Sequence, residues 1–274
     1  MVVGMARAVA SGMSCGWRAV SRCLLASFLG FAGAAQAIRA DEPPVSPPAL
    51  SAFCQAPAGD IATPEPLPHL AAALESKRVV RVLAIGSSST VGVGASAPSN
   101  GYPAQLEQIL EKMFKGVQID IVNRGVSGEV AATTAERLKT EVALERPDLV
   151  LWQLGTNDAL ARVPVDDFVE TVRDMLEWLK EHQVDTVLVG LQFTPHALKD
   201  EHYTAIRNAL RTLASAENVL LVRRFEAMRF IEQATQVDLL SADDLHLNDL
   251  GYRCMAEHIA HAVIVSTFLL GRQH

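Results

Sequence analysis

The stretch RVVRVLAIGSSST, residues 78–90, decides the fold, because a mainly apolar run ends abruptly in a glycine and three serines. Residues 78–85 are rich in β-branched side chains and too few for a buried helix, so they predict a buried strand. In a parallel sheet, the loop that follows the carboxyl end of such a strand is where function gathers. Serines are common in turns, however, so an attacking hydroxyl here needs partner residues elsewhere in the chain.

From residue 77 onward, apolar strand patterns alternate with amphipathic helical ones. This alternation predicts a parallel sheet covered by helices on both faces, and right-handed crossovers make it flavodoxin-like. We therefore expect the α/β class, as a three-layer α/β/α sandwich with a five-stranded parallel sheet. The expected strands are 78–85, 117–122, 148–154, 185–191 and 218–223. The expected helices are 102–114, 131–144, 165–180, 201–216, 225–235 and 250–269.

The N-terminus has the three parts of a secretory signal peptide. Three arginines precede the apolar run of residues 23–37, which ends in the small-residue pattern Ala35-Gln36-Ala37. A membrane anchor is the alternative, but the run is too short to span a bilayer comfortably. We expect a signal peptide over residues 1–37, cleaved after Ala37 or Ala40, and hence a periplasmic or secreted protein without stable membrane insertion.

Residues 38–76 form a proline-rich extension ahead of the domain expected over 77–270. Their first part, residues 41–68, contains eight of the 13 prolines and no helical or strand period, which predicts an extended leader or a strap on the surface. After signal cleavage Cys54 and Cys254 remain. The sequence leaves a disulfide between them and two unpaired thiols equally open, because it does not give their separation.

The charge balance narrows the class of partner. Removing residues 1–40 takes away four arginines and no acids, which leaves 20 basic against 31 acidic side chains. Nucleic acids and anionic membrane surfaces reward basic patches, so neither is expected as a partner. The sequence does not indicate an oligomeric state.

Four polar segments follow strands or precede the last helix, and all four fall near one rim of the expected sheet. They are GSSST (86–90), NRGVSGE (123–129), GTND (155–158) and DDLHLND (243–249). The loop of residues 86–94 contains no lysine, so it is not a phosphate-binding P-loop, and it lacks the third glycine of a dinucleotide fingerprint. The remaining chemistry lies in hydroxyl, imidazole, carboxylate and amide groups.

Each of these groups also has an ordinary structural interpretation. His246 follows Asp243 by three residues; a carboxylate can fix the imidazole tautomer, but such a pair is often a surface hydrogen bond. Asn157 could donate its amide N–H to an oxyanion or cap the next segment. Gly128 would let a backbone N–H approach the same point, with Gly125 competing for that position.

Together the four segments resemble the SGNH hydrolases, also called GDSL esterases, in order and spacing over residues 78–265. The segment DDLHLNDLGY, against the family's D-x-x-H-x-N pattern, is the most specific match. The resemblance implies Ser88 as nucleophile, His246 as base and Asp243 as orienting acid. It also implies an oxyanion hole formed by the Ser88 and Gly128 backbone N–H groups and the Asn157 side chain.

The sequence departs from the family at one named position: Ser87 stands where the G-D-S triplet has aspartate, and Ser89 adds a second neighbouring hydroxyl. The implied reaction is a two-step acyl transfer in which Ser88 attacks an ester and His246 shuttles the proton. It needs no metal and no organic cofactor. The implied substrates are small-molecule or carbohydrate esters, with an O-acetylated carbohydrate favoured by family analogy.

Three alternatives stay open at this point. A secreted glycan-binding or assembly protein could use the same scaffold without cleaving its ligand. A metal-dependent hydrolase could be built on Asp243, Asp244, His246 and Asp249, although these ligands come from one short loop. Acyl transfer to a sugar rather than to water would use the same residues.

Overall fold

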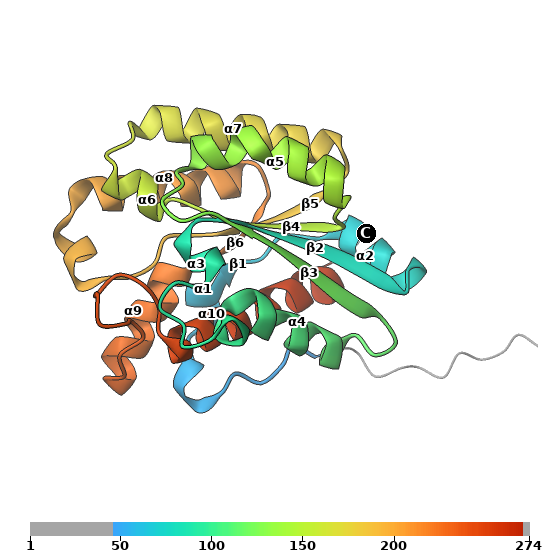
Figure 1. Ribbon diagram of the computed structural model, residues 1–274, viewed down its shortest axis with the longest axis horizontal. Helices are drawn as coiled ribbons and strands as arrows, with labels where there is room; N and C mark the ends of the chain where they lie inside the picture. Colours follow the sequence, from blue (N-terminus) through green and yellow to red (C-terminus); the bar gives the residue numbers. More distant parts are fainter. Residues whose placement is uncertain (1–45, 271–274) are drawn as a thin grey trace, which may run out of the picture. The chain divides into compact units, whose positions relative to one another are not determined.

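The computed structural model describes residues 46–270, so the predicted signal peptide lies outside the described residues. A six-stranded sheet forms the centre, in the order β1-β6-β5-β4-β2-β3 (Figure 1). Strands β2 to β6 are parallel and have the flavodoxin-like order, which confirms the expected fold class. The strands are β1 Ala62–Thr63, β2 Val79–Gly86, β3 Gln118–Gly125, β4 Leu149–Gln153, β5 Asp185–Val189 and β6 Leu220–Val222.

Helices cover both faces of this sheet, with α5, α7 and α8 on one side and α4 and α10 on the other (Figure 1). The α-helices are α1 Ala58–Ile61, α2 Pro68–Ser76, α3 Ser88–Val91, α4 Tyr102–Met113, α5 Ala131–Glu145, α6 Thr156–Leu160, α7 Val165–Glu181, α8 Glu201–Ala216, α9 Arg224–Thr235 and α10 Asp249–Ile264. Short helical segments are η1 Ala52–Cys54, η2 Pro98–Asn100, η3 Pro195–Lys199 and η4 Val265–Leu270. The last of these is a π-helical turn, so the expected helix of residues 250–269 is α-helical only as far as Ile264.

The buried pattern of each element explains why it forms. All five residues of β4 are buried, as expected for a strand covered on both faces. Helix α7 begins after Pro164 with two acidic residues in its first turn, and it buries one apolar stripe. That stripe consists of Phe168, Val172, Met175, Leu176 and Leu179.

The proline-rich extension contributes more structure than its sequence predicts. Ala62 and Thr63 pair antiparallel with β6, which makes the sheet six-stranded rather than five-stranded. Helix α2 follows and buries Leu70 in the core. A two-residue strand is too short to give any period, so the sequence pattern could not predict it.

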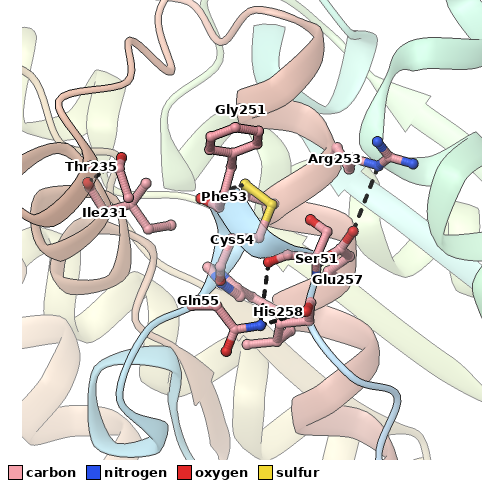
Figure 2. Close-up of a disulfide and its surroundings, with 12 residues drawn as sticks. Ser51, Phe53, Cys54, Gln55, Ile231, Thr235, Gly251, Arg253, Glu257 and His258 are labelled. Carbon is pink, nitrogen blue, oxygen red and sulfur yellow. Dashed lines mark hydrogen bonds and ion pairs between the residues drawn. A yellow bond between two sulfur atoms is a disulfide. The ribbon is translucent and has the colours of Figure 1, made fainter.

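A disulfide between Cys54 and Cys254 ties this extension to α10 (Figure 2). The same contact is reinforced on both sides of the disulfide. The Ser51 N–H donates to the Glu257 carboxylate over 2.7 Å, and His258 Nε2 lies 2.7 Å from the Cys54 carbonyl oxygen. The extension is therefore a strap held on the domain, and the question that the sequence left open is decided in favour of the disulfide.

Within residues 46–270, no helix is long and apolar enough to cross a membrane. At the carboxyl edge of the sheet, β2 and β3 end side by side, with Gly86 paired to Gly125. Strand β4 ends beside them at Gln153. The loops that leave these ends are the polar segments singled out in the sequence.

Candidate active site

Ser88 is the first residue of α3, directly after β2 and one turn residue. Its neighbours are buried and their hydroxyls are engaged: Ser87 Oγ donates to Gln153 Oε1 over 3.0 Å, and Ser89 Oγ lies 3.3 Å from Gln192 Oε1. The Ser88 side chain is the partly exposed one of the three. The serine run therefore forms a tight turn that presents Ser88.

His246 and Asp243 complete a hydrogen-bonded chain with this serine. His246 Nε2 lies 3.0 Å from Ser88 Oγ, and His246 Nδ1 lies 2.5 Å from Asp243 Oδ2. The imidazole is 19 % exposed and the carboxylate 49 % exposed, so the chain runs from the cleft to the surface. This is the arrangement in which a base can accept a serine proton while an acid holds its tautomer.

The loop around Asp243 is organised by the carboxylate itself. Its Oδ1 accepts three hydrogen bonds, from Ser241 Oγ (2.8 Å), the Leu245 N–H (3.0 Å) and the His246 N–H (2.8 Å). Together with the bond from the His246 side chain, which has the largest effect, these donors hold the pKa of Asp243 well below its usual range. Asp243 is therefore held as a carboxylate at neutral pH.

Gly94 allows this loop to dock beside Ser88. Its φ is +93°, and a Cβ there would lie 2.5 Å from the Leu247 carbonyl oxygen. A second contact joins the same two segments, because Asp249 accepts hydrogen bonds from the Ser96 N–H and Oγ and from Asn100. The segment after α3 therefore positions His246.

Ser88, Gly128 and Asn157, the predicted oxyanion donors, all line the same cleft. Neither the Ser88 N–H nor the Gly128 N–H donates to an acceptor within the described part of the chain. Gly128 has a φ of +84° and is exposed, with open space where a Cβ would be. Asn157 Nδ2 donates one hydrogen bond to the Glu129 carbonyl over 2.8 Å, which leaves its second N–H for a ligand.

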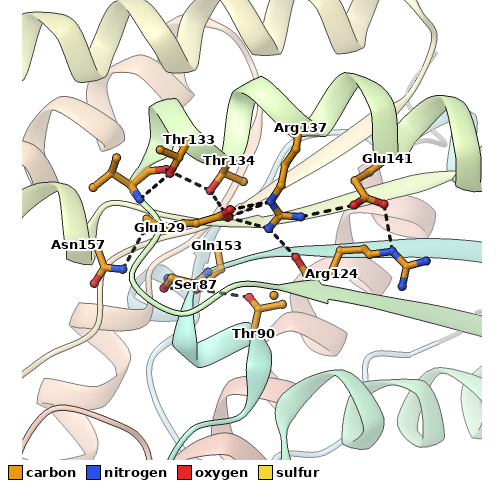
Figure 3. Close-up of polar contacts among 12 residues, drawn as sticks. Ser87, Thr90, Arg124, Glu129, Thr133, Thr134, Arg137, Glu141, Gln153 and Asn157 are labelled. Atoms are coloured by element: carbon orange, nitrogen blue, oxygen red, sulfur yellow. Dashed lines mark hydrogen bonds and ion pairs between the residues drawn. The ribbon is translucent and has the colours of Figure 1, made fainter.

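A charged cluster holds the loop that bears Gly128 (Figure 3). The Glu129 carboxylate accepts from Arg137 Nε (2.8 Å) and Nη2 (2.7 Å), and Arg137 also donates to the Arg124 carbonyl over 2.6 Å. Bidentate pairs of this kind fix geometry as well as adding energy. The bond between the Glu129 side chain and Arg137 thus fixes the Glu129 backbone carbonyl, which orients Asn157.

Asp158 locks the GTND turn to the start of α5. Its buried carboxylate accepts from the Gly155 N–H (3.0 Å) and the Ala131 N–H (2.8 Å), while burial raises its pKa. Roles for Asp158, Gln153 and the Glu129–Arg137 pair were not predicted from the sequence. Only the position of Asp158 inside a recognised motif could have indicated it.

The cleft between these groups has a volume of about 320 Å³. Ser88, Gly128, Asn157 and His246 all line it, so the structure brings the predicted site residues to one place. Among the described residues, no three or more His, Cys, Asp or Glu side chains are grouped to hold a metal ion. Asp249, one of the four ligands of the metal alternative, binds Ser96 and Asn100 instead.

Comparison with known families matches residues 53–267 to the model of the non-GDSL lipase-like family. The chain belongs to this family. The term non-GDSL agrees with the sequence Gly86-Ser87-Ser88, where serine replaces the aspartate of the G-D-S triplet. The resemblance to SGNH hydrolases drawn from the sequence is thereby confirmed.

Esterases are among the similar proteins of this non-GDSL lipase-like chain. It is 26 % identical over 158 residues to Esterase TesA of Pseudomonas aeruginosa, covering 57 % of this chain and 77 % of the relative. It is 22 % identical over 189 residues to an acetylxylan esterase of Geobacillus stearothermophilus, covering 62 % and 84 %. The crystal structure of a two-domain esterase (CEX) active on acetylated mannans has the same fold, with a TM-score of 0.65 at 19 % identity over 76 % of this chain and 56 % of that one. The family member described here is an ester hydrolase.

Proposed function

We propose that the protein is a serine esterase that removes a small acyl group from a carbohydrate ester by acyl-enzyme chemistry. The observation that carries this proposal is the hydrogen-bonded chain Asp243–His246–Ser88, with 2.5 Å and 3.0 Å between the atoms that would exchange or hold the proton. The Ser88 and Gly128 N–H groups and the second Asn157 N–H, which donate to no acceptor within the described residues, support it further.

In the proposed first step, Ser88 Oγ attacks the ester carbonyl carbon and its proton passes to His246 Nε2. The carbonyl π electrons move to the oxygen, which becomes an oxyanion facing the Ser88 and Gly128 N–H groups and the Asn157 amide. Collapse of this intermediate expels the alcohol, which takes the proton from His246. The second step repeats this chemistry with water, or with an acceptor hydroxyl when the acyl group is transferred.

The substrate class rests on the cleft and on the relatives. The cleft is lined by polar residues, among them Ser127, Thr156 and Gln192, and by the apolar side chains of Val93 and Leu245. Such a surface suits a small acyl group on a hydroxyl-rich alcohol. The acetylxylan and acetylmannan esterases among the relatives support an acetyl ester of a carbohydrate.

An extracytoplasmic location fits the same picture. Structural disulfides persist in oxidising compartments, and Cys54–Cys254 closes a separation of 200 residues. This supports export of the protein by the predicted signal peptide.

Hydrolysis of p-nitrophenyl acetate by the wild type, Ser88→Ala and Ser89→Ala tests the proposal. We expect Ser88→Ala to lower kcat by about 10⁴- to 10⁶-fold, and Ser89→Ala to lower it by less than about 10²-fold because its buried hydroxyl does not attack the ester. Acetylated xylan and mannan oligosaccharides, followed by acetate release, then test the substrate class. A wild type that neither turns over nor takes up a serine-directed fluorophosphonate would refute the proposal and favour a glycan-binding protein.

A further inference from the structure

Arg224 is the feature of the core that the proposed mechanism leaves unexplained. It is the first residue of α9, directly after β6, and only 2 % of it is exposed. Long charged side chains are almost never fully buried unless they are paired with an opposite charge. The position of Arg224 therefore needs a reason.

All the groups that Arg224 contacts through hydrogen bonds are neutral. Its Nε donates to the Gly190 carbonyl over 3.1 Å, and Nη1 donates to Ser89 Oγ over 3.0 Å. Weaker contacts reach Thr156 Oγ1 at 3.5 Å and Met255 Sδ at 3.7 Å. These bonds satisfy some of the N–H donors of the guanidinium but do not balance its positive charge.

No carboxylate forms an ion pair with Arg224 anywhere in the described residues. Three tyrosines lie near enough to act on it electrostatically, but burial raises the pKa of Tyr102 and Tyr203 to about 12 and that of Tyr252 even further. They are therefore neutral at physiological pH. Burial lowers the pKa of Arg224, yet a guanidinium is basic enough to remain charged in proteins. The resting protein thus keeps an uncompensated buried cation.

The two hydroxyls that Arg224 contacts belong to the two segments of the candidate site. Ser89 follows Ser88, and its hydroxyl is fixed between Arg224 and Gln192. Thr156 precedes Asn157, and both line the cleft. The cation therefore lies behind the proposed nucleophile and behind one of the proposed oxyanion donors.

We propose that the guanidinium of Arg224 stabilises the negative charge that arises at the site only during the reaction. This inference rests on the proposed function. When Ser88 Oγ bonds to the carbonyl carbon, its proton goes to His246 and the π electron pair goes to the carbonyl oxygen, which becomes the missing counter-charge. Arg224 is a positioning residue that acts through Ser89 and Thr156, and through its electric field across these buried side chains.

Arg224→Lys keeps the positive charge and loses the planar guanidinium donors, whereas Arg224→Gln keeps hydrogen bonding and loses the charge. Arg224→Met removes both. Arg223→Met is the matched control, because the adjacent Arg223 pairs with Glu226 and donates to the Gly59 carbonyl and has no contact with Ser89 or Thr156 among the hydrogen bonds of the described residues. We expect Gln and Met to lower kcat for p-nitrophenyl acetate by roughly 10- to 100-fold with KM within about 2-fold. This is less than the 10²–10³ expected for a direct oxyanion donor, because Arg224 acts one residue away. Arg224→Lys should have a kcat at least tenfold higher than Arg224→Gln or Arg224→Met, and Arg223→Met should match the wild type.

Thermal unfolding of each variant is measured alongside, and the wild type and Ser88→Ala are assayed in the same series. If Gln retains as much kcat as Lys, or if Gln and Met equal the wild type, the charge has no role and the inference is wrong even though the esterase proposal stands. If the wild type itself is inactive and unlabelled by fluorophosphonate, the proposed function fails and the inference fails with it. Should Arg224→Met not fold, the comparison between Lys and Gln decides alone.

Discussion

Replacing Asp243 by asparagine should inactivate the enzyme by reversing the tautomer of His246. Three donors converge on Asp243 Oδ1, namely Ser241 Oγ and the N–H groups of Leu245 and His246. An amide nitrogen cannot accept these bonds, so the asparagine oxygen must occupy that position. Its NH₂ group then faces His246 Nδ1, where the carboxylate Oδ2 now lies at 2.5 Å.

In this geometry His246 Nδ1 accepts a hydrogen bond and Nε2 carries the proton. Nε2 is the nitrogen that lies 3.0 Å from Ser88 Oγ, so it can no longer accept the serine proton. A base in the wrong tautomer lowers kcat on the order of 10⁴-fold in an Asp-His-Ser arrangement. Since 49 % of the Asp243 side chain is exposed and water can relax the site, we expect a loss of about 10³- to 10⁴-fold, with KM changed by less than about 3-fold.

Steady-state hydrolysis of p-nitrophenyl acetate measures this loss, and ¹⁵N chemical shifts of His246 report the tautomer directly. Ser241→Ala is the matched control, because it removes one bond to Oδ1 without changing the group that faces the imidazole. We expect this control to keep kcat within about 5-fold of the wild type. An Asp243→Asn variant within tenfold of the wild type, or one whose His246 keeps the proton on Nδ1, would refute the reasoning.

Four further outcomes follow from the structure. Asn157→Ala should lower kcat by about 10²- to 10³-fold in the same assay, and a change in KM alone would argue against an oxyanion donor. Gly94→Ala should lower the free energy of unfolding by about 1–3 kcal/mol and slow turnover, because its Cβ would meet the Leu247 carbonyl at φ +93°; denaturant titration and kinetics check both. Burial lowers the pKa of His258 to about 4, so the unfolded chain binds a proton on this imidazole more readily than the folded protein does. The free energy of unfolding should therefore fall by up to roughly 3 kcal/mol as the pH is lowered from 6.5 to 4, and His258→Gln should lack this dependence. Replacing both Cys54 and Cys254 by alanine should lower the free energy of unfolding by about 2–4 kcal/mol, whereas an unchanged denaturation midpoint would mean that the strap adds no stability.

The parallel core of the fold could be predicted because its elements carry strong periods. The buried run of β4 and the apolar stripe of α7 each indicate the type of element, and right-handed crossovers place helices on both faces of a parallel sheet. Strand β1 could not be predicted, since two residues carry no period and their pairing with β6 is a tertiary contact. The disulfide likewise depends on a distance between residues 200 positions apart.

The candidate site residues could be named from motifs, but the reasons for their positions could not. Short motifs place Ser88, His246 and Asn157 on loops at one rim, and a parallel sheet brings such loops together. The Glu129–Arg137 pair and the buried Arg224 have no local sequence signature, because each depends on which elements pack against it. A charged residue at the start of a helix resembles any exposed N-terminal residue until its burial is known.

Covalent capture of the nucleophile is the most direct test of the assignment of Ser88. The mature wild type is incubated with a fluorophosphonate, and the adduct is located by peptide mass spectrometry, with Ser88→Ala treated in parallel. We expect a single adduct on Ser88, none on Ser87 or Ser89, and none in the variant. An adduct on either neighbouring serine, or equal labelling of Ser88→Ala, would contradict this assignment.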